Sequence, residues 1–352
     1  MSSVLSDSQA LLEQAAAWQA AGQKVAVATV VKTWGSSPRP PGSLLIVRED
    51  GAFVGSVSGG CIEAAVVTAA QASMQDRAPR LLSFGVTNDM AWEVGLACGG
   101  QVEVFVRALA GEGPDVERYA ALRRALTQRQ PVALLTAIPD GDQQLLTLDA
   151  SAVAATLRLP ADEAVRQTVA SALTRDQALD VASEDATAPR RFVQPFCPPP
   201  RLIIVGAVHI AQPLSQLAAL TGLEVLVIDP RTAFASEARF PGVDLRTSWP
   251  AQALASVGID GHTAVVTLTH DPKLDDPALE AALRSPAFYV GALGSGKTHA
   301  SRCNRLRAKG FSDEQIARVH GPVGLKIGAR SPAEIAVSIL AELIAALRGE
   351  AR

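Results

Sequence analysis

Two cysteines lie in glycine-rich turns and could supply thiolates to a ligand. Cys61 follows Ser58-Gly59-Gly60 and precedes a predicted helix, whereas Cys98 precedes Gly99-Gly100. A helix N-terminus lowers the pKa of a nearby thiol, and a thiolate suits a soft metal or a sulfur-bearing ligand. The glycine turns would offer backbone N–H groups to a phosphate or to the edge of a pterin. The alternative is that each cysteine is a small buried packing residue.

Three further polar residues lie where ligands commonly bind. Arg39 follows Pro38 on a proline-rich loop that would hold its guanidinium in place. His209 and His270 each follow an apolar strand, and the carboxyl ends of such strands form the ligand-binding edge of doubly wound sheets. Both histidines could instead be ordinary polar loop residues. The sequence contains no Ser-His-Asp order and no H-E-x-x-H motif, so it does not indicate a hydrolase or a zinc protease.

The sequence Gly206-Ala207-Val208-His209-Ile210-Ala211 follows an apolar strand and begins a predicted helix. It is similar to the dinucleotide fingerprint G-x-G-x-x-G/A, and Asp229 ends the second strand 23 residues after Gly206. Val208 replaces the middle glycine, against which a pyrophosphate would lie. The pattern therefore predicts a Rossmann sheet more clearly than it predicts bound NAD(P). Asp229 could instead cap a turn with Pro230.

The sequence GALGSGKT, from Gly291 to Thr298, matches the P-loop pattern G-x-x-x-x-G-K-[ST] and includes Gly294 and Lys297. A P-loop enzyme also needs a later apolar strand that ends in an aspartate for Mg²⁺, and the sequence has none. The alternative is a glycine-rich turn of a Rossmann sheet. The helix after such a turn would bind an anionic group through its free N–H groups.

The order of predicted elements divides the chain at a proline-rich stretch. After this stretch, continuous apolar strands alternate with helices, which is typical of a doubly wound parallel sheet covered on both faces. Before it, shorter strands and helices predict α/β structure. The predicted organisation is an N-terminal α/β domain, a middle α/β segment packed on it, a linker and a Rossmann-like domain, over residues 1–110, 111–185, 186–200 and 201–352.

Local signals are clearest at one hairpin and at the last helix. Residues 44–47 and 52–57 predict a hairpin with an Asp50-Gly51 turn. Ser331, Pro332 and Glu334 form a capping box at the start of the last helix.

Composition and charge exclude several classes of protein. Hydrophobic residues make up 48% of the 352 residues, which predicts a globular chain with a substantial core. A net charge of −3 and an aromatic content of 4% argue against nucleic-acid binding. The N-terminus lacks the features of a signal peptide, and the most apolar helix contains Glu334 and Glu342 and is too short to span a bilayer. We expect a soluble, cytoplasmic protein that binds neither nucleic acid nor membranes.

Several motifs together resemble the xanthine dehydrogenase accessory protein family of the XdhC/CoxI type. The N-terminal motifs are VATVVKTWGSSPRPPGS, VGSVSGGCIE and ACGGQVEV. The C-terminal motifs are IIVGAVHIAQPL, VIDPR, THD, YVGALGS and GPVGLKIGARSPAEIAVSILAEL. The resemblance covers residues 20–110 and 200–345 by motif and is more specific than the P-loop string alone.

This resemblance implies a chaperone that is not itself an enzyme. Such a protein would bind the molybdenum cofactor (molybdopterin), hold it while a cysteine desulfurase supports its sulfuration, and deliver it to a xanthine dehydrogenase-like molybdoenzyme. Cys61, Cys98 and Arg39 match family positions, and the two thiols would contact molybdenum or its sulfur. The chain could form a homodimer. The alternative is a nucleotide-dependent enzyme, either an NAD(P)-linked oxidoreductase or a P-loop-like NTPase, that uses the C-terminal sheet.

Overall fold

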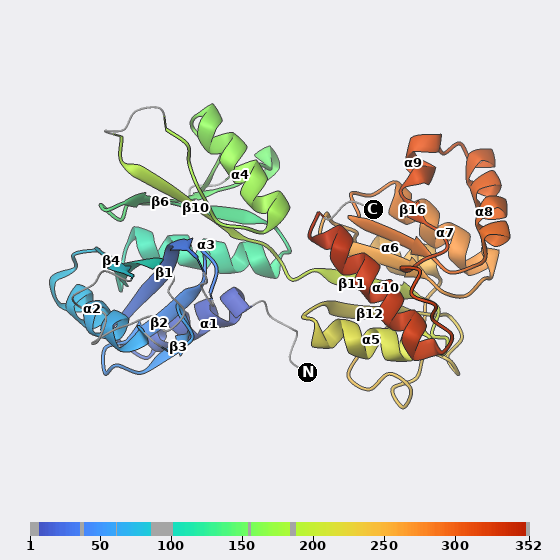
Figure 1. Cartoon of the computed structure of the whole chain (residues 1–352), viewed down its shortest axis with the longest axis horizontal. Helices are drawn as coiled ribbons and strands as arrows, with labels where there is room; N and C mark the ends of the chain where they lie inside the picture. The colour runs from blue at the N-terminus through green and yellow to red at the C-terminus, as the bar shows by residue number, and fades with distance from the viewer. Residues whose placement is uncertain are drawn as a thin grey trace. The chain divides into compact units, whose positions relative to one another are not determined.

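The computed structural model describes residues 7–35, 39–60, 62–85, 101–153, 156–183 and 188–349. Contacts divide the chain into an N-terminal unit of residues 5–198 and a C-terminal unit that begins at residue 199 (Figure 1). The prediction of mixed α/β structure with a parallel sheet at the C-terminus is confirmed.

Two five-stranded sheets form the framework of the N-terminal unit. The first sheet is antiparallel, in the order β3-β2-β1-β5-β4, with β1 (Val25–Trp34), β2 (Leu44–Arg48), β3 (Phe53–Gly55), β4 (Arg80–Phe84) and β5 (Gln101–Leu109). The second has the order β8-β7-β6-β10-β9, with β6 (Val132–Ile138), β7 (Gln143–Leu146), β8 (Leu157–Arg158), β9 (Leu179–Asp180) and β10 (Arg190–Phe196). The helices of this unit are α1 (Asp7–Ala20), α2 (Glu63–Asp76), α3 (Pro114–Thr127) and α4 (Glu163–Arg175), with a short 3-10 turn at Ala150–Ala152.

Alternating side chains of β1 build two cores. Val25 and Val27 join a cluster that includes residues of α1, α3 and the second sheet, whereas Ala26 and Ala28 face the cluster around α2. This division follows from the two-residue period of a strand. Residues from before and after position 110 therefore share one core. The hairpin predicted around Asp50-Gly51 is the β2–β3 pair.

The stretch predicted to be a linker, residues 186–200, differs in the structure. Its central part is β10, which pairs along its whole length with β6. Pro195 is compatible with this strand because β9 pairs only with Phe192 and Val193, so Pro195 lies beyond the end of β9. The prolines at 198–200 follow the strand, and the division between the units falls among them.

A six-stranded parallel sheet forms the centre of the C-terminal unit, in the order β13-β12-β11-β14-β15-β16. Its strands are β11 (Arg201–Val205), β12 (Glu224–Ile228), β13 (Asp244–Arg246), β14 (Thr263–Thr267), β15 (Tyr289–Ala292) and β16 (Val319–His320). The helices are α5 (Ala211–Leu220), α6 (Pro250–Val257), α7 (Pro272–Leu283), α8 (Gly296–Ala308), α9 (Asp313–Ala317) and α10 (Pro332–Leu347).

Helices cover both faces of this sheet, as the continuous apolar strands predict (Figure 1). Leu202 and Ile204 of β11 face the cluster with α5 and α10, and Ile203 and Val205 face the cluster with α6 and α7. The capping box predicted at Ser331 is present at the start of α10.

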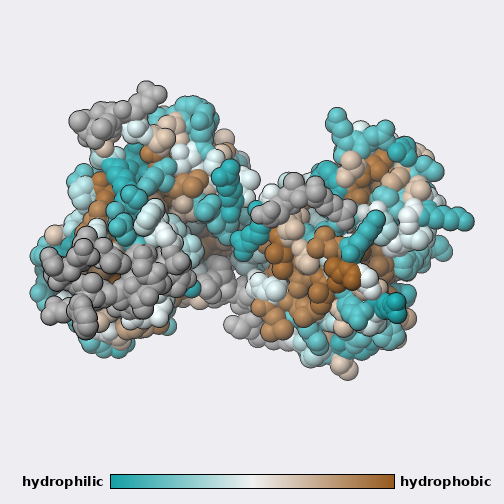
Figure 2. Space-filling model, viewed as in Figure 1, coloured by the Kyte–Doolittle hydropathy of each residue, from teal (hydrophilic) through white to brown (hydrophobic). Residues whose placement is uncertain are grey.

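The surface of the C-terminal unit carries apolar side chains over α10 (Figure 2), where Ile344 and Ala346 are only partly buried. Among the helices of the described segments, none is long and apolar enough to cross a membrane.

Candidate functional site

The turn before α2 wraps around the carboxylate of Glu63, the first residue of that helix. The backbone N–H groups of Ser58 and Gly59 donate to Glu63 Oε1 at 3.0 and 3.1 Å. The N–H of Gly60 donates to Oε2 at 2.9 Å. The hydroxyls of Ser56 and Ser58 donate to the same carboxylate at 2.8 and 2.6 Å. Glu63 is therefore an internal anion that fills the turn.

This arrangement differs from the expectation that Ser58, Gly59 and Gly60 offer their N–H groups to a ligand, since Glu63 already accepts from all three. Burial by itself raises the pKa of Glu63, but hydrogen bonds from Ser58 and Ser56 outweigh it and lower the pKa to about 2. The carboxylate is ionised at neutral pH, so charge-assisted hydrogen bonds hold the turn. Its structural role is to fix the backbone that leads to position 61.

Arg39 lies against the same turn. Its Nε donates to the carbonyl oxygen of Ser56 at 3.3 Å. The structure thus brings together two parts of the predicted site, Arg39 and the turn over residues 58–60. The remaining predicted members lie outside the described residues, so their ligand and metal roles stay predictions: Cys61, Cys98, Gly99 and Gly100.

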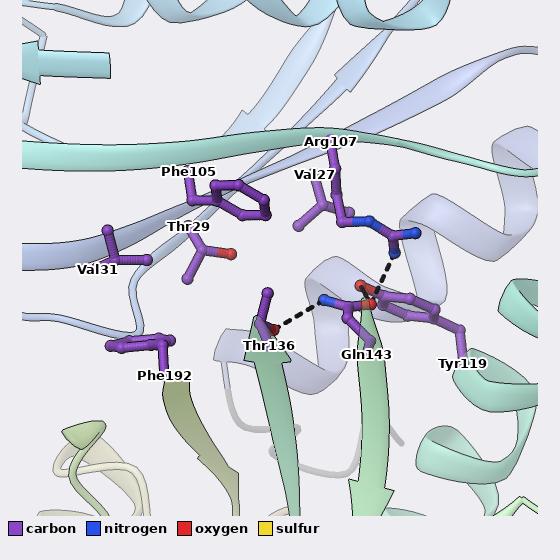
Figure 3. Close-up of a pocket in the computed structure, with 9 residues that line it drawn as sticks. All are labelled: Val27, Thr29, Val31, Phe105, Arg107, Tyr119, Thr136, Gln143 and Phe192. Atoms are coloured by element: carbon purple, nitrogen blue, oxygen red, sulfur yellow. Dashed lines mark hydrogen bonds between the residues drawn. The ribbon is translucent and has the colours of Figure 1, made fainter. Parts of the chain in front are cut away.

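A small polar cavity lies between the two sheets of the N-terminal unit (Figure 3). Arg107 of β5 reaches Gln143 of β7, with Nη1 donating to Oε1 at 2.7 Å, and Gln143 Nε2 donates to the Thr136 hydroxyl at 3.1 Å. The cavity volume is about 10 Å³, which is close to the space for a single water. The cavity is too small for a pterin or a nucleotide, so these polar groups join the sheets.

In the C-terminal unit, Asp229 is fully buried at the end of β12 and is used internally. Its Oδ2 accepts the N–H of Ala207 at 2.8 Å, and Arg231 donates to both carboxylate oxygens from its side chain at 2.9 and 2.7 Å. Burial raises the pKa of Asp229, but the hydrogen bonds from Arg231 and Ala207 outweigh it and lower the pKa overall. An acid that binds a ribose needs free acceptor positions. The geometry of Asp229 therefore does not support NAD(P).

The glycine loop itself is also closely packed. Gly206 has φ +109°, and a Cβ at this position would lie 2.5 Å from Thr269 Cγ2, so only glycine fits here. Val208 is partly buried and packs against the core cluster that includes α5 and α10. The residue that replaces the middle glycine of the fingerprint is thus a packing residue. His209 is exposed on this loop.

The turn over residues 294–297 lies at the N-terminus of α8. Ser295 is the N-cap, and its hydroxyl accepts the N–H of Thr298 at 3.1 Å. Gly294 has φ +150°, and Lys297 is exposed. Lys297 and His270 line one cavity, which brings these two predicted residues together.

Comparisons with known proteins agree with the motifs. A model of the XdhC Rossmann domain matches residues 202–343, and a model of the XdhC and CoxI family matches residues 18–85. A Bacillus subtilis protein whose name describes a probable subunit of xanthine dehydrogenase is 30% identical over 92% of this chain and 93% of its own length. The chain belongs to the XdhC and CoxI family. The Escherichia coli protein named "Molybdenum cofactor insertion chaperone PaoD" is also 30% identical, over 92% of this chain and 83% of its own length.

A solved structure from Bacillus halodurans, described as a xanthine dehydrogenase, has the same fold. It is 26% identical, with a TM-score of 0.72 over 99% of this chain and 97% of that chain. The XdhC and CoxI segment at 18–85 contains Arg39 and the Glu63 turn, and the XdhC Rossmann segment contains Asp229 and Lys297. The resemblance read from the sequence is confirmed.

Two residues of these family segments are not among the candidates from the sequence. Glu63 could have been found as an acid in the first turn of a helix that follows a glycine turn. Arg302, which is buried and lines the cavity of Lys297, has no local sequence signal. Within the described ranges, no group of three or more His, Cys, Asp or Glu side chains is positioned to hold a metal ion.

Proposed function

We propose that this protein is a molybdenum cofactor insertion chaperone that serves a xanthine dehydrogenase-like enzyme. Membership of the XdhC and CoxI family supports this function, as do the names of two relatives that align over more than nine-tenths of the chain. The cofactor is the cargo of the protein, and the molybdoenzyme is its partner.

In this proposal, the cargo binds at the Glu63 turn of the N-terminal unit. The observation that carries it is the contact between Arg39 and the turn that leads to Cys61. A guanidinium suits the phosphate of the cargo, and thiolates of Cys61 and Cys98 suit its molybdenum or sulfur. Gly99 and Gly100 complete the proposed site beside Cys98. Because Glu63 uses the N–H groups of residues 58–60, this turn would contribute side chains rather than backbone N–H groups to the ligand.

A cysteine desulfurase would support the sulfuration of the bound cargo, and the protein would act in the cytoplasm. The rival function, a nucleotide-dependent enzyme, is not favoured by the C-terminal unit. Asp229 is committed to Ala207 and Arg231. A P-loop enzyme needs a later strand that ends in an aspartate. The described residues from the Lys297 turn to residue 349 contain one strand, β16, and it ends in His320.

Recovery of the cargo after separation tests the function. The purified full chain is incubated with released molybdenum cofactor and passed through a gel-filtration column, and the protein fraction is assayed for oxidised pterin fluorescence. A pterin signal that travels with the protein and restores activity to a cofactor-free xanthine dehydrogenase supports the proposal. A protein fraction without pterin would exclude it.

A further inference from the structure

A polar cavity lies at the N-terminus of α8 in the C-terminal unit. Its volume is about 280 Å³, near the lower end of the range for small-molecule sites. Most of its lining side chains are charged or carry a hydroxyl, and these are Asp275, Lys297, Thr298, Ser301, Arg302 and Arg305. This volume suits a phosphate group with part of its ester, but not a whole dinucleotide.

Arg302 is the most unusual residue of this cavity, because its guanidinium is only partly hydrogen-bonded. The residue is 1% exposed, and its Nη2 donates to the carbonyl oxygen of Leu293 at 2.8 Å. Within the part of the chain that the structure describes, the buried Nε and Nη1 have no hydrogen-bond partner. Buried donors of a charged group are costly to leave unpaired, so their presence calls for an acceptor.

Asp275 is the acidic residue that pairs with Arg302 at long range, but its oxygens accept hydrogen bonds from other groups. The Arg302 Nη2 lies 3.9 Å from Asp275 Oδ2, beyond hydrogen-bond distance. The carboxylate instead accepts the hydroxyl of Thr269 at 2.7 Å and the N–H of His270 at 3.1 Å. Burial raises the pKa of Asp275, so the distant guanidinium does not compensate for its desolvation. Asp275 thus does not satisfy the two unpaired donors of Arg302.

The charges around the helix end favour an anion. The first turn of α8 has no acidic residue and carries the exposed Lys297. Arg305 is already paired with Asp276, at 2.6 and 2.9 Å. Among the residues that line the cavity, Lys297 and Arg302 supply two positive charges beyond the Arg305 pair, and Asp275 is the one acidic residue. The free N–H groups at a helix N-terminus add to this positive potential.

We infer that this cavity binds the phosphate group of a phosphate ester, with Lys297 and Arg302 as its cationic contacts and the N-terminus of α8 as its backbone donor. The hydroxyls of Thr298 and Ser301, which line the same cavity, could donate to further phosphate oxygens. A free nucleotide and the phosphate-bearing cargo of the proposed function share this chemistry. No phosphoryl transfer is part of the inference.

Titration of the full chain with inorganic phosphate and with pyrophosphate, followed by ³¹P NMR and by thermal unfolding, tests the site. We expect saturable binding that raises the melting temperature. Lys297→Ala should weaken the affinity by about tenfold, as expected for one charge-assisted contact. Arg302→Met, which keeps a long buried side chain, should remove the binding. Lys326→Ala is the matched control, because Lys326 is an exposed lysine of the same unit outside the cavity.

An absence of saturable binding, or equal affinities of wild type, Lys297→Ala and Arg302→Met, would overturn the inference. If Arg302→Met does not fold, Lys297→Ala still decides, since Lys297 is exposed. Competition then separates the sources. Displacement of phosphate by cytidine or adenosine diphosphate identifies a free nucleotide, and displacement by released molybdenum cofactor identifies the cargo. Binding of phosphate without retention of pterin would keep this site and reject only the proposed function.

Discussion

The backbone N–H of Gly60 donates a hydrogen bond to the carboxylate of Glu63 at 2.9 Å, so the glycine turn is filled by the first residue of its own helix. Removing this carboxylate leaves several donors of the turn without an acceptor. We expect Glu63→Ala to lower the free energy of unfolding by about 2–4 kcal/mol. Glu63→Gln, which keeps one acceptor oxygen, should lose less. Urea denaturation measures both, with exposed Glu117→Gln as a control that should change little. A normal urea midpoint for Glu63→Ala would contradict this role.

The same carboxylate predicts a dependence of stability on pH. The pKa of Glu63 falls from 4.5 to about 2 in the folded chain, so the ionised form is favoured by folding. This contribution is fully present above pH 4.5 and is lost as the pH falls toward 2. Melting temperatures of wild type and Glu63→Gln should therefore converge between pH 6 and pH 3. If the difference between the two melting temperatures stays constant over this pH range, the carboxylate of Glu63 does not titrate as stated.

NAD(H) should not bind, even when the fingerprint is restored. Val208→Gly recreates the middle glycine, but Asp229 still holds Ala207 and Arg231. Because Val208 packs against the core, the substitution should cost about 1–3 kcal/mol of stability. Calorimetry of wild type and variant with NAD(H) checks the affinity, and a micromolar dissociation constant in either protein would show that the site is open.

Nucleotide hydrolysis should stay at background despite the GALGSGKT sequence. Between the Lys297 turn and residue 349, where the description ends, the C-terminal sheet gains only β16, which ends in His320 and supplies no carboxylate for Mg²⁺. We expect no release of phosphate from ATP or GTP with Mg²⁺ at saturating nucleotide. A wild-type rate that disappears in Lys297→Ala would promote the NTPase alternative.

The proposed thiol ligands make a separate prediction. Cys61→Ala and Cys98→Ala should each weaken retention of the molybdenum cofactor, because each substitution removes a thiolate–metal contact. Neither substitution should unfold the chain. Pterin fluorescence after gel filtration measures the retention, and circular dichroism checks the fold. Cys303→Ala, a partly exposed cysteine of the C-terminal unit, is the control. Equal retention by all four proteins would exclude the thiols as ligands.

Local sequence patterns predicted the structure correctly where residues close in the chain satisfy the backbone hydrogen bonds of a helix end or a turn. The capping box at Ser331 and the hairpin turn at Asp50-Gly51 depend on residues a few positions apart, and both are present. The alternation of apolar strands and helices after residue 200 likewise predicted the parallel sheet, because its central strands β11, β14 and β15 are buried on both faces. The prolines around Pro195 misled the prediction, because a proline-rich stretch is typical of a linker. Only the pairing with β6 shows that this stretch contains a strand.

The sequence by itself therefore determined the family, the fold class and the turns at which polar residues gather. Only the tertiary structure decided how those residues are used. Asp229 and Glu63 are acids of the kind that often bind ligands. In the structure, each carboxylate instead accepts hydrogen bonds from backbone N–H groups of a neighbouring loop. Arg302 lies in α8, and only the packed structure shows that its Nη2 donates to the carbonyl oxygen of Leu293 while its Nε and Nη1 have no partner among the described residues. Hydrogen-bond satisfaction is a property of three-dimensional neighbours, which residue spacing along the chain does not specify.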